Sequence, residues 1–175
     1  MNYEVLKHTP ISGDFEEKHF GKIGTNPRWI KFNPIDSDCW IGSFASGDIG
    51  LINEKIDEIN KTSKIGLLIN GAFYLIDKDS RDLILHPENG FFIDFEILLD
   101  QNLIFLATYC GIYVFKDNKQ IREIRPDFID GIRFTKKIDN LLIGKICEPS
   151  NNGGEWSEFE LNLHTLKIKW GKYEY

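Results

Sequence analysis

The chain has 175 residues, enough for one domain with a substantial core, and its 42% hydrophobic and 27% charged residues are typical of a globular protein. A net charge of −6, without a long block of either sign, disfavours direct binding to nucleic acid or to an anionic membrane, because both repel an acidic surface. Thirteen Phe, six Tyr and four Trp against one Met favour β-rich packing. We therefore expect a single all-β domain over residues 1–175.

The first ten residues, the apolar stretches and the cysteines indicate the cellular compartment. The first ten residues carry charges and no apolar run, and the longest apolar stretches are too short for a membrane-spanning helix. The three cysteines, Cys39, Cys110 and Cys147, are odd in number and widely spaced, which is typical of reduced thiols. These features predict a cytoplasmic protein without disulfides.

Residues 1–26 have the weakest hydrophobic pattern in the chain, so no helix or strand is predicted for them. A first strand-rich unit is expected over residues 27–62. At its end, residues 53–62 are the one segment with helical spacing, since Ile56 and Ile59 lie three apart among charged residues. We predict a turn or two of helix there. The strands of this unit are placed at 29–32, 39–44 and 49–52.

The second unit, residues 63–98, contains a predicted tight hairpin. Asn70-Gly71 separates two apolar runs, and this dipeptide supplies the positive φ angles that a type I′ turn requires. A second polar turn at residues 77–80 leads into a third strand. The strands are placed at 65–69, 72–76 and 82–85, and alternation over 91–97 predicts a strand that opens the next unit.

The same layout recurs about forty residues later, in a third unit over residues 99–131. Aligning Gly71 with Gly111 places Phe73 on Tyr113. Residues 103–107 are apolar on both faces, so their strand is predicted to be central in its sheet. The strands of this unit are placed at 103–108, 112–115 and 120–124.

The fourth unit, residues 132–172, holds the clearest alternation. Two alternating runs joined by His164-Thr165 predict a hairpin with one buried and one wet face. Residues 148–154 are polar and glycine-rich, which predicts an exposed loop. Strands are placed at 141–147, 155–163 and 166–170. Repeats of three or four strands at this period predict a propeller-like antiparallel meander of three to four units, with a β-sandwich as the alternative.

The segment Phe159–Trp170 resembles the strand-turn-strand signature of quinoprotein-like β-propeller repeats, in which an aromatic-apolar strand, a polar turn and a closing Lys-apolar-x-Trp strand follow each other. Leu166 replaces the usual turn glycine. Residues 73–77 and 112–116 resemble the first strand, so the likeness covers about half the chain. It implies a meander of small antiparallel sheets, and no residue matches a quinone site, so no cofactor is expected. Other segments are similar to small bacterial proteins without an assigned activity: Trp40–Phe44, Asp130–Phe134 and Trp156–Leu163.

The common signatures of catalysis are absent from the sequence. There is no Cys-x-x-Cys or His-x-x-x-His pair, no glycine-rich phosphate loop and no nucleophile elbow. A pairing of Cys110 with a histidine distant in sequence stays open, because the two need only meet in space. We therefore expect neither an enzyme nor a metal site.

A binding role is the remaining expectation. Loops of a repeated β-scaffold project aromatic and acidic side chains together, and Trp is prominent among interface hot spots. We expect a protein-binding module, most concretely an acidic immunity or inhibitor protein that covers a basic bacterial effector. The alternatives are a small-ligand-binding or enzymatic domain with a site at the centre of the β-assembly, and a structural repeat that self-associates. The candidate partner-binding residues are Asp38, Trp40, Asp130, Glu155 and Trp156.

Overall fold

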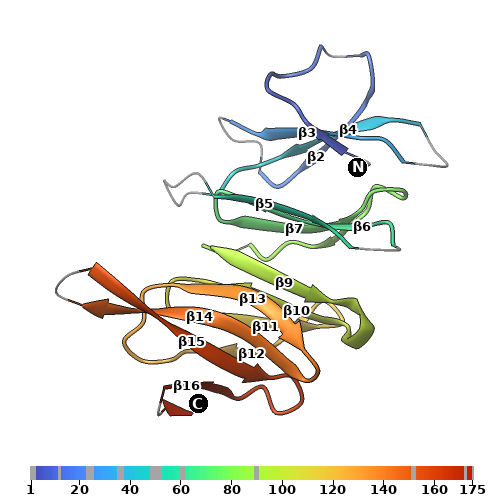
Figure 1. Cartoon of the computed structure of the whole chain (residues 1–175). Helices are drawn as coiled ribbons and strands as arrows, with labels where there is room; N and C mark the ends of the chain where they lie inside the picture. Colours follow the sequence, from blue (N-terminus) through green and yellow to red (C-terminus); the bar gives the residue numbers. More distant parts are fainter. Residues whose placement is uncertain are drawn as a thin grey trace. The chain divides into compact units, whose positions relative to one another are not determined.

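The chain folds into strands arranged in four sheets (Figure 1). The computed structural model describes residues 3–11, 13–22, 26–34, 38–47, 53–59, 62–88, 91–150, 153–171 and 173–174, the last pair by backbone alone. The one helical element within these ranges is a 3-10 turn, Leu99–Gln101, and they contain no helix long and apolar enough to cross a membrane. The predicted all-β class is confirmed.

Sheet A contains two strands in the region where no element was expected. Its strands are β1 (Tyr3–Val5), β2 (Glu16–Phe20), β3 (Arg28–Phe32) and β4 (Trp40–Phe44), in the order β1-β3-β4-β2. β2 runs parallel to β4, whereas the other pairs are antiparallel. β2 reads Glu-Glu-Lys-His-Phe and buries Phe20 fully, so its apolar contribution is too small to stand out by alternation. The strand predicted at residues 49–52 lies outside the described residues.

Sheet B is a meander with an edge strand in place of the predicted helical turn. Asn70 and Gly71 have φ angles of +47° and +95°, as a type I′ turn requires. The helix prediction for residues 53–62 is wrong, because β5 pairs antiparallel with β6 and lays Ile56 against the core. Its strands are β5 (Glu54–Glu58), β6 (Lys64–Ile69), β7 (Ala72–Asp77) and β8 (Leu83–Leu85).

Sheet C is also a meander, in the order β12-β11-β10-β9. All five residues of β10 are buried and it has a neighbour on each side, so its predicted central position is confirmed. Asp117 and Asn118, with φ angles of +49° and +63°, make a second two-residue hairpin turn. Its strands are β9 (Asp94–Leu98), β10 (Leu103–Ala107), β11 (Ile112–Lys116) and β12 (Lys119–Ile124).

Sheet D contains the longest strands. Residues 148–150 and 153–154 of the predicted loop are strand, because the β14–β15 ladder continues without a register shift as far as Ser150 and Gly153. Residues 151–152 lie outside the described residues. The turn predicted at His164-Thr165 is confirmed. The strands are β13 (Ile132–Ile138), β14 (Leu141–Ser150), β15 (Gly153–Asn162), β16 (Ile168–Trp170) and β17 (Tyr173–Glu174), in sequence order.

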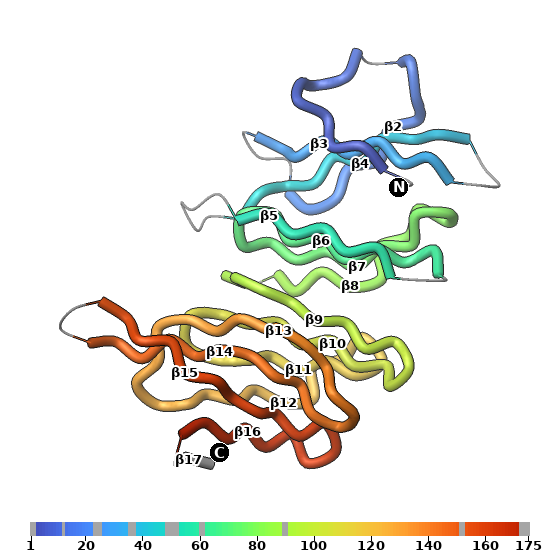
Figure 2. Tube along the Cα trace, viewed as in Figure 1, coloured from blue at the N-terminus to red at the C-terminus, as the bar shows by residue number. Residues whose placement is uncertain are grey.

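The chain divides into two compact units, each with its own core. The N-terminal unit, residues 1–91, contains sheets A and B, and the C-terminal unit, residues 92–175, contains sheets C and D. Figure 2 follows the chain from one sheet to the next. The repeated sheets of the predicted meander are therefore confirmed, while the one-domain assignment and its repeat boundaries stay predictions. The N-terminal core is built from Phe20, Ile30, Phe32, Trp40, Phe44, Ile65, Leu67, Ile69, Tyr74 and Ile76.

Candidate protein-binding surface

The structure brings three of the five candidate residues together. Asp130, Glu155 and Trp156 are exposed and lie at one end of sheet D. Asp38 is exposed but belongs to the N-terminal unit. Trp40 has no exposed surface, so it belongs to the core and we leave it out of the proposed surface.

The three residues meet where sheet D narrows to two strands. β13 begins at Ile132, opposite Ile146, and beyond this pair β14 and β15 continue together as far as Ser150 and Gly153. We call this extension, residues 147–150 and 153–156, the β14–β15 arm. In Figures 1 and 2 the arm projects past the other strands of its sheet. Its side chains are therefore far less covered than those of the sheet behind it.

A bulge at the base of the arm fixes the position of Trp156. The Asp130 N–H donates to the Cys147 carbonyl at 2.8 Å, and the Cys147 N–H donates to the Gly131 carbonyl at 2.9 Å, so two residues oppose one. Gly131 has a φ of +141°, and a Cβ added there would lie 3.3 Å from Cη2 of Trp156. The indole therefore rests close to the Gly131 backbone, which a side chain at that position would disturb.

Arg133 holds the other side of the indole. Its guanidinium lies 5.4 Å from the centroid of the Trp156 ring, a cation–π contact worth about 0.5–1 kcal/mol at an exposed site. Both residues are on the face opposite the core, because Arg133 pairs with Lys145 and Trp156 pairs with Cys147. Trp156 is fixed in orientation yet keeps 45% of its surface exposed.

Phe128 is a functional candidate that the sequence patterns missed. It precedes the bulge by two residues. Its side chain is 90% exposed, a larger fraction than that of any other exposed large hydrophobic residue among those described. Its φ of +59° is unfavourable for an aromatic residue by about 1–2 kcal/mol. Strained residues of this kind collect at functional sites. Its position among Pro126, Asp127 and Asp130, outside any alternating run, was the available signal.

The loop that carries Phe128 is anchored at its start. Nε of Arg125 donates to Oε1 of Glu123 at 2.5 Å. Burial would raise the pKa of Glu123, but hydrogen bonds from Arg125 and Tyr113 outweigh it and lower the pKa of this carboxyl. For Tyr113, burial and then the hydrogen bond to Glu123 raise the pKa of the phenol. These groups fasten the chain where it leaves β12.

Three carboxylates lie along the arm, and two of them, Glu148 and Glu155, are on its core-facing side. Glu148 and Glu155 are direct cross-strand partners, an arrangement that destabilises a sheet when both residues are ionised. Asp130 lies one residue away, opposite Cys147. The arm thus carries an oriented indole on one face and the Glu148–Glu155 pair, which a cationic group would neutralise, on the other. We define the arm surface as Phe128, Asp130, Arg133, Glu155 and Trp156.

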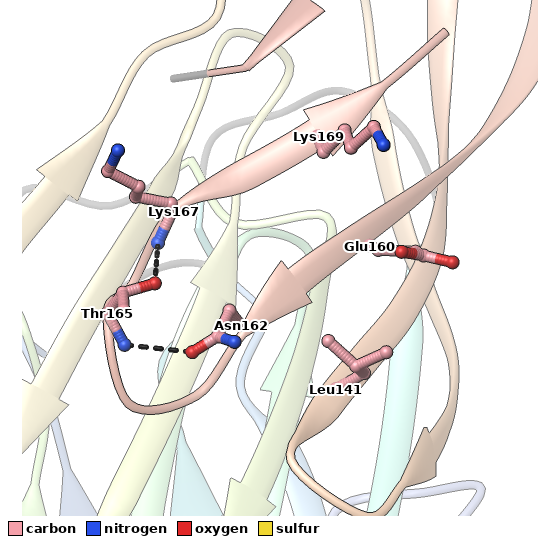
Figure 3. Close-up of a pocket in the computed structure, with 6 residues that line it drawn as sticks. All are labelled: Leu141, Glu160, Asn162, Thr165, Lys167 and Lys169. Carbon is pink, nitrogen blue, oxygen red and sulfur yellow. Dashed lines mark hydrogen bonds between the residues drawn. The ribbon is translucent and has the colours of Figure 1, made fainter.

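Two hollows among the described residues lie on the surface and are open to solvent. One, of about 430 Å³, is shown in Figure 3 beside the turn after β15. Two of its polar side chains form the turn, since Asn162 Oδ1 accepts from the N–H groups of His164 and Thr165, and Thr165 Oγ1 accepts from the N–H of Lys167. The charged side chains of Glu160, Lys167 and Lys169 also line this hollow, which is open to solvent.

A second hollow, of about 360 Å³, lies between residues 6–15 and sheet A. Leu6, Ile11 and Ile41 contribute apolar surface to it. Nζ of Lys31 lies 4.2 Å from the centroid of the Phe15 ring.

Metal-binding and thiol chemistry find little support in the described ranges. They contain no cluster of three or more His, Cys, Asp and Glu side chains that could hold a metal ion. Sγ of Cys110 lies 3.8 Å from Oγ1 of Thr108. In the part of the chain that the structure describes, no histidine hydrogen-bonds to Cys110, and Nδ1 of His86 instead contacts the Phe73 carbonyl at 2.8 Å.

Comparison with known proteins leaves the geometry as the basis for inference. No model of a protein family matches the chain. No curated protein matches it at a significant level either. The function must therefore be inferred from the arm surface, its charge and its exposure.

Proposed function

We propose that the protein is a non-enzymatic binding module that covers a basic surface of a partner protein with its arm surface. The observation that carries this proposal is Trp156, whose indole is held between Gly131 and Arg133 while 45% of the side chain stays exposed. An oriented, half-exposed Trp beside an Arg, with an exposed Phe in the segment that leads into the bulge, has the composition of an interface hot spot. Fixing the indole before binding lowers the entropy that the complex must lose.

Charge supports a basic partner. The chain carries −6 overall, and Asp130, Glu148 and Glu155 gather at the arm. Acids at an interface steer a cationic partner and speed the encounter more than they add affinity. In its most concrete form, the proposal is an immunity-type inhibitor that acts in the cytoplasm on a basic bacterial effector. We also propose that the four sheets are blades of quinoprotein-like repeats, supported by the meander order of sheets B, C and D.

The test uses the partner that co-purifies with the chain in stoichiometric amount from its own host. Trp156→Ala and Phe128→Ala should each weaken that complex by about thirtyfold, which corresponds to about 2 kcal/mol for a hot-spot residue. Phe91→Ala is the matched control, because Phe91 is also exposed but lies outside the arm surface. Equal affinities for the three variants and the parent chain, measured by calorimetry, would refute the proposed surface.

Small-ligand binding is the second candidate function. The hollow between residues 6–15 and sheet A favours it, because apolar side chains line it and Lys7 and Lys31 offer cations to an amphipathic anion, although the acids Glu4 and Asp14 also line it. A thermal-shift screen with aromatic and fatty carboxylic acids tests this function. Stabilisation that Lys31→Ala abolishes supports it, and no stabilisation by any of these acids excludes it.

A further inference from the structure

β15 has an open edge along the arm. It pairs with β14 over all ten of its residues, Gly153–Asn162, but with β16 only over Phe159–Leu161. Among the described strands, Gly153–Glu158 therefore has a neighbour on one side only. Five of these six residues are exposed, and Ser157 is half-buried. A row of free backbone groups of this kind is a template for another strand.

The ladder shows which backbone groups face the open side. The Asn162 N–H donates to the Lys167 carbonyl on the β16 side, and the Leu163 N–H donates to the Asn140 carbonyl on the β14 side. The β14–β15 register runs without a shift, and backbone groups of successive residues alternate between the two sides of a strand. Gly154, Trp156 and Glu158 therefore direct their N–H and C=O groups to the open edge.

This edge has little of the protection that natural sheets use. Strand edges are usually guarded by Lys, Pro or a bulge, and Gly153–Glu158 contains none of the three. Its only charges are Glu155 and Glu158. These negative charges repel acidic segments and attract basic ones, so the edge can still pair with a basic strand but disfavours an acidic one.

The side-chain rows of the arm indicate what an added strand would carry. Glu148 and Glu155 form one row, and a residue placed opposite Glu155 would extend it. A Lys or Arg there would offset the repulsion between the two aligned carboxylates. On the other face, the next position of the added strand would meet Trp156, which favours an apolar side chain.

We propose that the open edge of β15 accepts an extended, basic segment of the partner as an additional strand, with cationic and apolar residues in alternation. The proposal rests on the proposed function, because the strand lies beside the same arm surface. Backbone hydrogen bonds to Gly154, Trp156 and Glu158 supply affinity, while the acidic row and Trp156 select the sequence.

The experiment uses the full chain and a short peptide in which lysine and valine alternate. Titration should slow amide exchange at Gly154, Trp156 and Glu158, observed by NMR, while amides directed toward β14 change little. A peptide of the same sequence with alternate backbone nitrogens methylated keeps the charge but loses the donors, and should not bind. Glu155→Gln should weaken the parent peptide by up to about fivefold, the effect of one cross-strand charge pair.

The outcomes separate strand addition from the broader proposal. Equal binding of the methylated peptide, or binding without protection of the three amides, overturns strand addition. So does no binding at all. In each case the partner's sensitivity to Trp156→Ala and Phe128→Ala still tests the proposed function by itself. Protection of the three amides without peptide, rising with protein concentration, also overturns the proposal, because the occupant would then be a second copy of the chain.

Discussion

The indole Nε1 of Trp40 donates a hydrogen bond of 2.8 Å to the backbone carbonyl of Lys78. Trp40 belongs to β4 of sheet A, and Lys78 follows β7 of sheet B, so this bond joins the two sheets. The ring also stacks on Phe32 at 4.4 Å between centroids. A Trp that satisfies a buried carbonyl and fills the core in this way serves stability and has no surface left for a partner.

Trp40→Phe should therefore lower the free energy of unfolding by about 1–3 kcal/mol, because the Lys78 carbonyl loses its buried donor. Urea denaturation followed by circular dichroism measures the change. Trp156→Phe is the matched control and should stay within about 0.5 kcal/mol, since its ring is nearly half exposed and Phe keeps an aromatic face for Arg133. Equal destabilisation by the two substitutions would contradict the different roles assigned to these tryptophans.

The strands that could be predicted are those whose apolar residues alternate against one buried face. β15 is one example, since Phe159 and Leu161 are both in the core. β1 and β2 could not be predicted, because β1 has too few residues to show alternation, β2 is mostly charged, and both owe their place to neighbouring strands of sheet A. β5 was misassigned for a related reason. A single partly buried Ile56 in an edge strand fits a helical spacing as well as an extended one.

The same reasoning explains the partial success at the candidate site. In β15 the odd positions face the core, so Trp156, at an even position, had to face outward. In β4 every residue is buried, and alternation cannot show whether Trp40 is inside or outside. Phe128 escaped notice because its exposure depends on a loop conformation with positive φ, which no sequence pattern of Phe indicates.

Tyr74 predicts how the N-terminal unit responds to alkali. Its hydroxyl donates to the Ala45 carbonyl at 2.8 Å, and burial raises the pKa of the phenol from 10.0 to about 12. Because the pKa is raised on folding, the protonated Tyr74 hydroxyl contributes fully to stability below pH 10, and this contribution is lost as the pH rises through 12. Absorbance titration should show one tyrosine that ionises well after the exposed ones.

Tyr74→Phe should remove that late step and leave the rest of the curve unchanged. It should also lower the free energy of unfolding at neutral pH by about 1–2 kcal/mol, since the Ala45 carbonyl loses its donor. An identical titration curve for the variant would show that another tyrosine is the late one.

Asp94 links the two sheets of the C-terminal unit. Its Oδ2 accepts from the Phe134 N–H of β13 at 2.7 Å, at the point where the β13–β14 register shifts. Asp94→Ala should therefore cost about 1–3 kcal/mol of unfolding free energy, because that N–H is left without its acceptor in a partly buried place. Lys119→Ala, an exposed change in the same unit, should stay within about 0.5 kcal/mol. A loss no larger than that of the control would argue against a role for this bond.

Phe128 predicts opposite effects on stability and on binding. Asn tolerates a positive φ better than Phe, and the exposed ring has little contact to lose, so Phe128→Asn should stabilise the chain by about 0.5–1 kcal/mol. The same change should weaken the complex with the basic partner, because the exposed ring is gone. Urea denaturation and calorimetry on one preparation measure both quantities.

The control for this pair of effects is Phe91→Asn, which also removes an exposed ring but not from a residue with positive φ. It should change neither stability nor affinity appreciably. A gain in stability for Phe128→Asn with unchanged affinity would mean that the strain at Phe128 serves no contact with the partner. A loss in both would mean that the ring supports the loop itself. Only a gain in stability together with a loss of affinity fits a side chain that is held in a strained conformation for recognition.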